Sequence, residues 1–249
     1  IELTGIELAT ACQWIENAIA DSACGIMDQA TSVLGEEGTC LPLLCQPCEI
    51  QSLVHLPGDL RLWAIDSGVK HAISGIEYEA ARAAAFVGYR AICTWQNVPI
   101  LPDIESPIPR FTDSWFDGYL SRLSPSLFRS RFEMLLPEHL SGDEILSEGV
   151  IHPDPFTQIR PGVSYPIRGC TRYAVEEQQR IEMFVTLLRG IGNSTGSYTY
   201  RLLGDLMFQS HWSYTECGLG CKETDRIVEL VREEASAGTP QSALYGAKI

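Results

Sequence analysis

The chain has 249 residues, of which 45% are hydrophobic and 20% charged, so it is long enough to bury one large or two small cores. Its formal net charge of −14 argues against nucleic-acid binding and against docking on an anionic membrane, because both require an excess of Lys and Arg. A nucleotide is still admissible as a ligand, since backbone N–H groups and Mg²⁺ can bind phosphates against an acidic background.

The first predicted element is an amphipathic helix over residues 4–20. Its apolar positions recur at helical spacing and are Leu8, Ala11, Cys12, Ile15 and Ile19. A small-residue turn at Cys24-Gly25 then leads into a short helix with Asp28 near its start. The positive end of a helix dipole favours an ionised carboxylate there, which can accept a proton in catalysis. The alternative is that Asp28 only caps the helix.

Three apolar runs separated by turn residues follow, and they predict strands of an antiparallel sheet: Thr39–Leu44, Ile50–His55 and Leu60–Ile65. The last strand ends in a polar loop that opens a helix over residues 76–92. Loops of this kind present functional groups on a rigid scaffold.

The second half of the chain reads as mostly helical. Residues 97–115 are rich in proline and predict a surface loop that connects subdomains. Short helices are expected over residues 116–148, and longer ones over 166–190, over 198–213 and from Thr224 onward. Along the helix at 166–190, the residues expected to face inward are Val175, Ile181, Phe184, Val185 and Leu188.

Nine cysteines are scattered through the hydrophobic segments, and we expect them to be reduced thiols in a cytoplasmic protein. Cys45 and Cys48 do form a C-x-x-C pair, with Cys40 nearby, which leaves a zinc or redox site as an alternative. No second C-x-x-C pair completes a zinc site. No apolar run approaches the roughly 20 residues of a transmembrane helix, and no signal peptide is evident.

The heptapeptide Ala23–Gln29 resembles the catalytic-aspartate segment of the sugar kinases of the GHMP superfamily, the galactokinase and L-arabinokinase family. Other stretches resemble the same family at similar spacing, so that the resemblance covers nearly the whole chain. They are Asp66–Gly68 with Tyr78, His152–Thr157, Leu203–Ser213 and Thr224–Val231. His152–Thr157 and Asp66–Gly68 are closer to arabinokinase-like sequences than to galactokinases.

The resemblance implies an α+β, GHMP kinase-type fold of two subdomains, with antiparallel sheets and packed helices, truncated at both ends. Residues 1–40 would complete the N-terminal subdomain, and residues 41–249 would form most of the C-terminal one. The implied activity is ATP-dependent phosphorylation of the anomeric hydroxyl of L-arabinose or galactose. ATP, Mg²⁺ and a small sugar are the implied ligands.

The resemblance also assigns residues to this activity. Asp28 matches the catalytic aspartate, and Glu16, twelve residues earlier, matches a glutamate that helps to hold Mg²⁺. Gly25, Asp66 and Tyr78 are expected to bind the sugar. Lys70 stands where the family usually has an arginine, and these two cations are not equivalent at a bidentate site.

The family's Gly/Ser-rich phosphate loops have no counterpart within these 249 residues, so the ATP-binding residues are expected outside the chain. Phosphoryl transfer depends on positioning and on neutralising phosphate charge. We therefore expect these residues alone to have little kinase activity. Two other hypotheses stay open: a non-catalytic sugar-sensing relative, and a thiol or zinc protein built on Cys40, Cys45 and Cys48.

Overall fold

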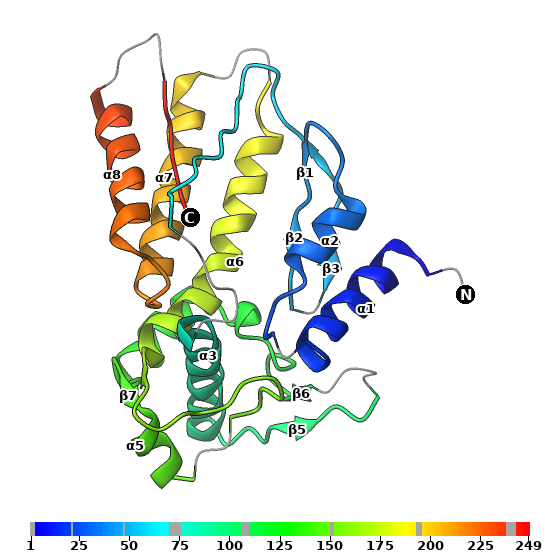
Figure 1. The fold of residues 1–249 in the computed structure, drawn as a ribbon, viewed down its shortest axis with the longest axis vertical. Helices are drawn as coiled ribbons and strands as arrows, with labels where there is room; N and C mark the ends of the chain where they lie inside the picture. Colours follow the sequence, from blue (N-terminus) through cyan, green and yellow to red (C-terminus); the bar gives the residue numbers. More distant parts are fainter. Residues whose placement is uncertain are drawn as a thin grey trace.

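The computed structural model describes residues 3–20, 22–46, 48–69, 76–105, 110–149, 152–192, 196–237 and 243–249. It is a helix-rich α+β structure (Figure 1). The helices are α1 (Gly5–Ala18), α2 (Met27–Leu34), α3 (Ile76–Trp95), α4 (Pro125–Arg131), α5 (Gly142–Ser147), α6 (Ile167–Arg189), α7 (Ser197–Thr215) and α8 (Lys222–Ala237), with 3-10 turns η1 (Leu120–Arg122) and η2 (Glu133–Leu135). The strands are β1 (Thr39–Cys40), β2 (Leu43–Leu44), β3 (Glu49–Ile50), β4 (Val54–His55), β5 (Leu101–Pro102), β6 (Phe111–Thr112), β7 (Leu140–Ser141) and β8 (Ser164–Tyr165).

The principal core lies where α3 crosses α6, and it includes buried aromatic side chains such as Tyr89 and Phe128. The two helices approach so closely that a Cβ atom added at Gly88 would lie 1.8 Å from Oγ1 of Thr171. Figure 1 shows α6 continuing from this crossing toward α7, against which it also packs. The long helices predicted at 76–92, 166–190 and 198–213 are confirmed. Ile181 differs from its expected inward position, because it is 36% exposed.

Helix α1 is confirmed, but the face predicted to be buried is wrong. Leu8, Ile15 and Ile19 are exposed, and Ala9 and Asn17 are buried instead. Asn17 is buried because of its hydrogen bonds: its side-chain amide accepts one from the Cys24 N–H at 3.1 Å and donates one to the Cys24 carbonyl at 3.3 Å. These bonds turn the Asn17 face of α1 toward the chain that leads into α2.

Strands β1 to β4 form an antiparallel hairpin in two tiers. In the outer tier β1 pairs with β4, and in the inner tier β2 pairs with β3. The prediction of a third strand at Leu60–Ile65 is wrong. This segment has no ladder partner among the described residues. Its side chain Trp63 is accordingly 82% exposed.

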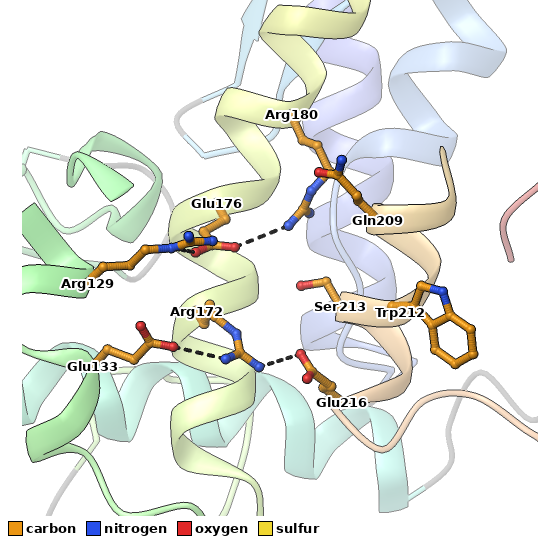
Figure 2. A pocket seen from close by; sticks show the side chains of 9 residues that line it. All are labelled: Arg129, Glu133, Arg172, Glu176, Arg180, Gln209, Trp212, Ser213 and Glu216. Carbon is orange, nitrogen blue, oxygen red and sulfur yellow. Dashed lines mark hydrogen bonds and ion pairs between the residues drawn. The ribbon is translucent and has the colours of Figure 1, made fainter. Parts of the chain in front are cut away.

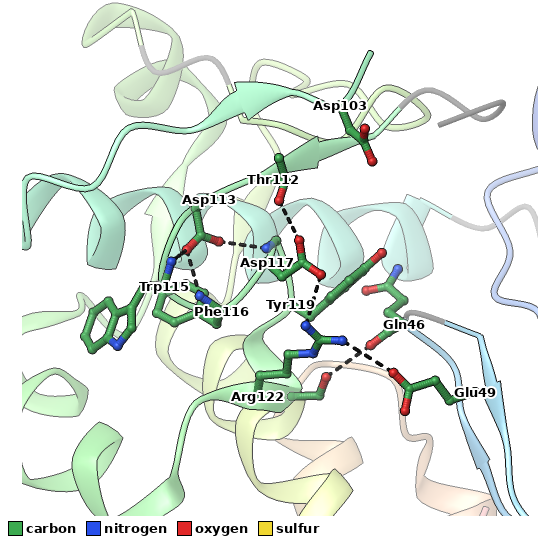
Figure 3. Close-up of polar contacts among 12 residues, drawn as sticks. Gln46, Glu49, Asp103, Thr112, Asp113, Trp115, Phe116, Asp117, Tyr119 and Arg122 are labelled. Atoms are coloured by element: carbon green, nitrogen blue, oxygen red, sulfur yellow. Dashed lines mark hydrogen bonds and ion pairs between the residues drawn. The ribbon is translucent and has the colours of Figure 1, made fainter. Parts of the chain in front are cut away.

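The tip of this hairpin docks on η1 (Figure 3). The Ser121 hydroxyl donates to the carbonyl of Gln46 at 3.3 Å, and Arg122 pairs with Glu49 at 3.4 Å. A second ion pair, 3.0 Å long, holds Arg122 to Asp117. The contacts fix the hairpin tip against the helical body of the molecule.

The proline-rich segment 97–115 contains more structure than the loop predicted for it. Strands β5 and β6 pair antiparallel within it, with Leu101 opposite Thr112. Residues 106–109, which join the two strands, lie outside the described residues. The expectation of a pure loop is therefore wrong, because a strand pair of two residues each leaves no periodic signal in the sequence.

The C-terminal part packs on α7. Tyr245 stacks near Tyr200 with ring centroids 5.2 Å apart, and the Tyr200 hydroxyl donates to Asp59 at 2.8 Å. No helix in the described ranges is both long and apolar enough to cross a membrane. The division at residue 40 into two subdomains stays a prediction.

Candidate active site

Asp28 lies where the sequence predicted, in the first turn of α2. The capping alternative is wrong, because the N-cap position belongs to Ile26 and Asp28 follows it by two residues. The Asp28 carboxylate is exposed, close to the positive end of the α2 dipole. The arrangement leaves the carboxylate accessible to a ligand from solvent.

Glu16 reaches the same region from α1. Its Oε1 accepts a hydrogen bond of 2.7 Å from the side-chain amide of Gln29, the residue after Asp28. The Cys24 thiol lies beside it, and burial followed by the Glu16 contact raises the pKa of Cys24 to about 11. Glu16 is thus placed next to the segment that carries Asp28.

Tyr78, from the first turn of α3, meets the turn that precedes α2. Burial raises the pKa of the Tyr78 hydroxyl, while the charge of Arg82 and a hydrogen bond from the backbone of Gly25 oppose the rise. Cys45, at the hairpin tip, lies within electrostatic reach of both Tyr78 and Asp28. Gly25, Asp28, Tyr78 and the hairpin tip therefore surround one region.

Arg82 and Asp154 are components of this region that sequence reasoning did not single out. The Arg82 guanidinium donates to both carboxylate oxygens of Asp154, at 2.8 and 3.0 Å, and to the carbonyl of Cys24 at 3.0 Å. One signal could have indicated Arg82: it follows Tyr78 by four residues on α3, so the two side chains share a helix face. Asp154 belongs to the His152–Thr157 motif, whose role was not predicted.

Among the described residues, no contact brings Asp66 to this region. Its carboxylate accepts a hydrogen bond of 2.8 Å from the backbone of Gly68, in a turn where Gly68 has a φ of +70°. The extended segment leading to Asp66 lies against α7, through Asp59 and Leu60, rather than against α2. Lys70 and His71, which continue the loop, lie outside the described residues.

The cysteines predicted as a possible zinc cluster are free thiols. Cys40 lies in β1, whereas Cys45 and Cys48 lie around the opposite end of the hairpin. Within the described ranges, no group of three or more His, Cys, Asp or Glu side chains is arranged to hold a metal ion.

A groove of about 460 Å³ lies elsewhere, between α4, η2, α6 and α7 (Figure 2). Its charged side chains pair with one another: Arg172 lies 2.9 Å from Glu133, and Arg129 lies 2.7 Å from Glu176. Because these cations are already neutralised by carboxylates, the groove is a poor site for a phosphate. None of the predicted site residues lines it.

Comparisons with known proteins give relatives for nearly the whole chain. No protein-family model matches the chain. The chain is 34% identical, over a 257-residue alignment, to the L-arabinokinase of Arabidopsis thaliana; the alignment covers 98% of this chain and 24% of that protein. It is 40% identical over 83 residues to the galactokinase of Chloroflexus aurantiacus, which covers 33% of this chain and 21% of that one.

The fold also matches a solved structure, the galactokinase of Lactococcus lactis in complex with galactose. The TM-score is 0.63 at 18% identity, over 94% of this chain and 47% of that chain. The chain thus spans about a quarter of the L-arabinokinase and about half of the solved galactokinase. These matches define a sugar kinase fold. The chain belongs to the GHMP sugar kinase family, in the group of L-arabinokinase and galactokinase, and matches part of their length.

Proposed function

We propose that this chain is the catalytic-aspartate part of an ATP-dependent sugar 1-kinase that acts on L-arabinose or galactose. The observation that carries the proposal is the 34% identity to an L-arabinokinase along 98% of the chain. The meeting of Gly25, Asp28 and Tyr78 around one region supports it. The nine free cysteines are consistent with a reducing compartment such as the cytoplasm.

In this proposal Asp28 acts on the anomeric hydroxyl of the sugar. The hydroxyl oxygen forms a bond to the γ-phosphorus of ATP, the bond from that phosphorus to the β-phosphate oxygen breaks, and ADP leaves with the electron pair. The hydroxyl proton goes to the Asp28 carboxylate, or is stabilised by it until transfer is complete. An exposed carboxylate at a helix start suits this role, because a substrate hydroxyl can reach its oxygens.

Three further residues would bind the sugar. The Tyr78 hydroxyl can hydrogen-bond a sugar hydroxyl while its ring gives apolar contact. Gly25 is exposed, and a Cβ atom there would meet nothing within 4 Å, so the open backbone leaves room for a sugar ring. Asp66 would join them from its loop.

Mg²⁺ would supply charge neutralisation on the phosphates of ATP when bound. Glu16 fits as one ligand, because carboxylate oxygen is the donor that Mg²⁺ prefers. The adjoining Gln29 Oε1 is buried and accepts no hydrogen bond among the described residues. That oxygen could accept from a water molecule shared with the ion, which is consistent with a cation near Glu16.

L-Arabinose and galactose share a ring hydroxyl pattern and differ at the hydroxymethyl group. A binding pocket can discriminate between two sugars that differ by one small group by only on the order of 10–200-fold. Both sugars therefore belong in the first assay.

The proposal is tested by replacing Asp28 in the complete natural protein. We expect Asp28→Asn to lower the turnover number for sugar phosphorylation by about 10²–10⁴-fold, because the amide cannot take the proton. The matched control is Glu37→Gln, an exposed carboxylate beyond the other end of α2. It should leave turnover within twofold of wild type.

Wild-type turnover in the Asp28→Asn variant would overturn the catalytic assignment. If the wild-type protein bound sugar and ATP without transferring phosphate, the sugar-sensing alternative would replace the kinase proposal.

A further inference from the structure

The turn before α2 is held by donors from two different helices. The carbonyl of Cys24 accepts hydrogen bonds from Arg82 at 3.0 Å, from Asn17 at 3.3 Å and from Gln13 at 3.4 Å. Asn17 and Gln13 belong to α1, whereas Arg82 belongs to α3. Arg82 thus ties this turn, four residues before Asp28, to the main core, next to the contact between Tyr78 and Gly25.

Arg82 is itself held in one orientation. Its two ion-pair contacts with Asp154 form a fork, and the Asp154 side chain is only 1% exposed. The Thr157 hydroxyl donates to the same carboxylate at 2.7 Å. The guanidinium carbon also lies 5.7 Å from the ring centre of Phe156 and 6.0 Å from that of Phe86. A planar cation with this many partners has little rotational freedom.

We infer that Arg82, clamped by Asp154, is a positioning residue of the kinase: it holds the Cys24–Gly25 turn against α3, so that Asp28 and Tyr78 face the same sugar. The inference rests on the proposed function and extends it. Tyr78 and Arg82 are one helical turn apart on α3, so the contact that fixes the turn also fixes its distance from Tyr78.

The geometry requires an arginine at position 82. The fork uses Nε and Nη2 for Asp154 and leaves Nη1 for the Cys24 carbonyl. A lysine ammonium is a single point charge and cannot reproduce this three-point contact. Arg82→Lys therefore keeps the charge beside buried Asp154 and releases the turn. Displacement of a reacting group by about 1 Å can cost on the order of 100-fold in rate.

The test uses the complete natural protein with Arg82→Lys and, separately, Asp154→Asn. We expect each variant to lower kcat for sugar phosphorylation by about 10- to 100-fold, with KM for ATP within twofold of wild type. Amide hydrogen exchange over residues 25–28 should become faster, while exchange in the middle of α3 stays unchanged. If Arg82→Lys does not fold, Asp154→Asn carries the same test.

Arg160→Lys is the matched control. Arg160 pairs with Glu79 at 2.6 Å, so it joins α3 to the same 152–160 segment without touching the turn. This variant should change neither kcat nor exchange over residues 25–28.

Unchanged kcat in both Arg82→Lys and Asp154→Asn would overturn the inference, as would a loss of kcat without faster exchange in the turn. A wild-type protein that phosphorylates no sugar would refute the proposed function instead. In that case the exchange measurement alone decides whether Arg82 holds the turn.

Discussion

At the scale of single residues, the carboxylate of Asp113, just after β6, accepts four hydrogen bonds. It accepts hydrogen bonds from the backbone N–H groups of Trp115 at 2.6 Å, Phe116 at 2.8 Å and Gly118 at 2.7 Å, as Figure 3 shows in part. The Tyr89 hydroxyl of α3 donates to it at 2.8 Å. Burial and this hydrogen bond raise the pKa of Tyr89, so the phenol stays protonated as a donor. The carboxylate therefore fastens the β6 turn to the core helix.

Removing this carboxylate should destabilise the fold. We expect Asp113→Ala to lower the free energy of unfolding by about 3 kcal/mol, because it leaves several buried donors without an acceptor. Urea denaturation measures the change. Glu138→Ala removes an ion-paired carboxylate that is 77% exposed, and it should cost about 0.5 kcal/mol or less. Equal effects of the two substitutions would contradict the structural role of Asp113.

At the scale of elements, the crossing of α3 and α6 depends on a residue without a side chain. Gly88 lies in α3 where Thr171 of α6 approaches it, and Thr171 is fully buried. The Thr171 hydroxyl donates to the carbonyl of Ile167 at 2.6 Å. This hydrogen bond fixes the Thr171 rotamer, so the side chain cannot rotate away from a methyl group added at position 88 without losing the bond. The crossing distance thus follows from one glycine.

We therefore expect Gly88→Ala to lower the free energy of unfolding by about 1–3 kcal/mol, despite the better helix propensity of alanine. Gly58→Ala is the control, since a Cβ atom there meets nothing within 4 Å. In a Thr171→Ala background, Gly88→Ala should lower the free energy of unfolding by less than it does in the wild-type protein. Thermal melts of the wild type, Gly88→Ala, Thr171→Ala and the double variant measure the coupling between the two positions. Additive losses of stability would show that the added methyl group at position 88 does not clash with Thr171.

At the scale of the whole molecule, some apolar surface faces solvent. Leu62, Trp63 and Ile65 are each more than 60% exposed along the extended segment after the hairpin. Leu8, Ile15 and Ile19 form a second exposed apolar row on α1. The L-arabinokinase that this chain matches is about four times as long as the chain, and the solved galactokinase is about twice as long.

The last prediction concerns activity. A protein made of these 249 residues alone should phosphorylate L-arabinose or galactose at less than about 1% of the rate of the complete natural protein. The reason is that we expect the Gly/Ser-rich loops that position ATP to lie outside these residues, and phosphoryl transfer depends on positioning. A coupled ADP-release assay with both sugars measures it. Turnover near that of the complete protein would show that ATP is bound in another way.

The sequence by itself determined the family, the place of Asp28 near the start of α2 and the positions of the long helices. Periodicity and short motifs are local properties of the chain, so they can be recognised from the sequence alone. The same local signals misjudged the buried face of α1, since Asn17 is buried for its hydrogen bonds to Cys24 rather than for hydrophobicity. They also overestimated the strand at Leu60–Ile65, because a strand needs a partner that its own residues do not specify.

Only the tertiary structure decided how the candidate site is assembled. Arg82 and Asp154 are 72 residues apart in the chain, and Arg82 and Cys24 are 58 apart. Nothing in the spacing of those residues indicates contact, because the path of the intervening chain sets which side chains meet. The predicted carboxylate Asp28 was visible from sequence, whereas the pair that holds its turn became visible only once α1, α3 and the 152–160 segment were packed together.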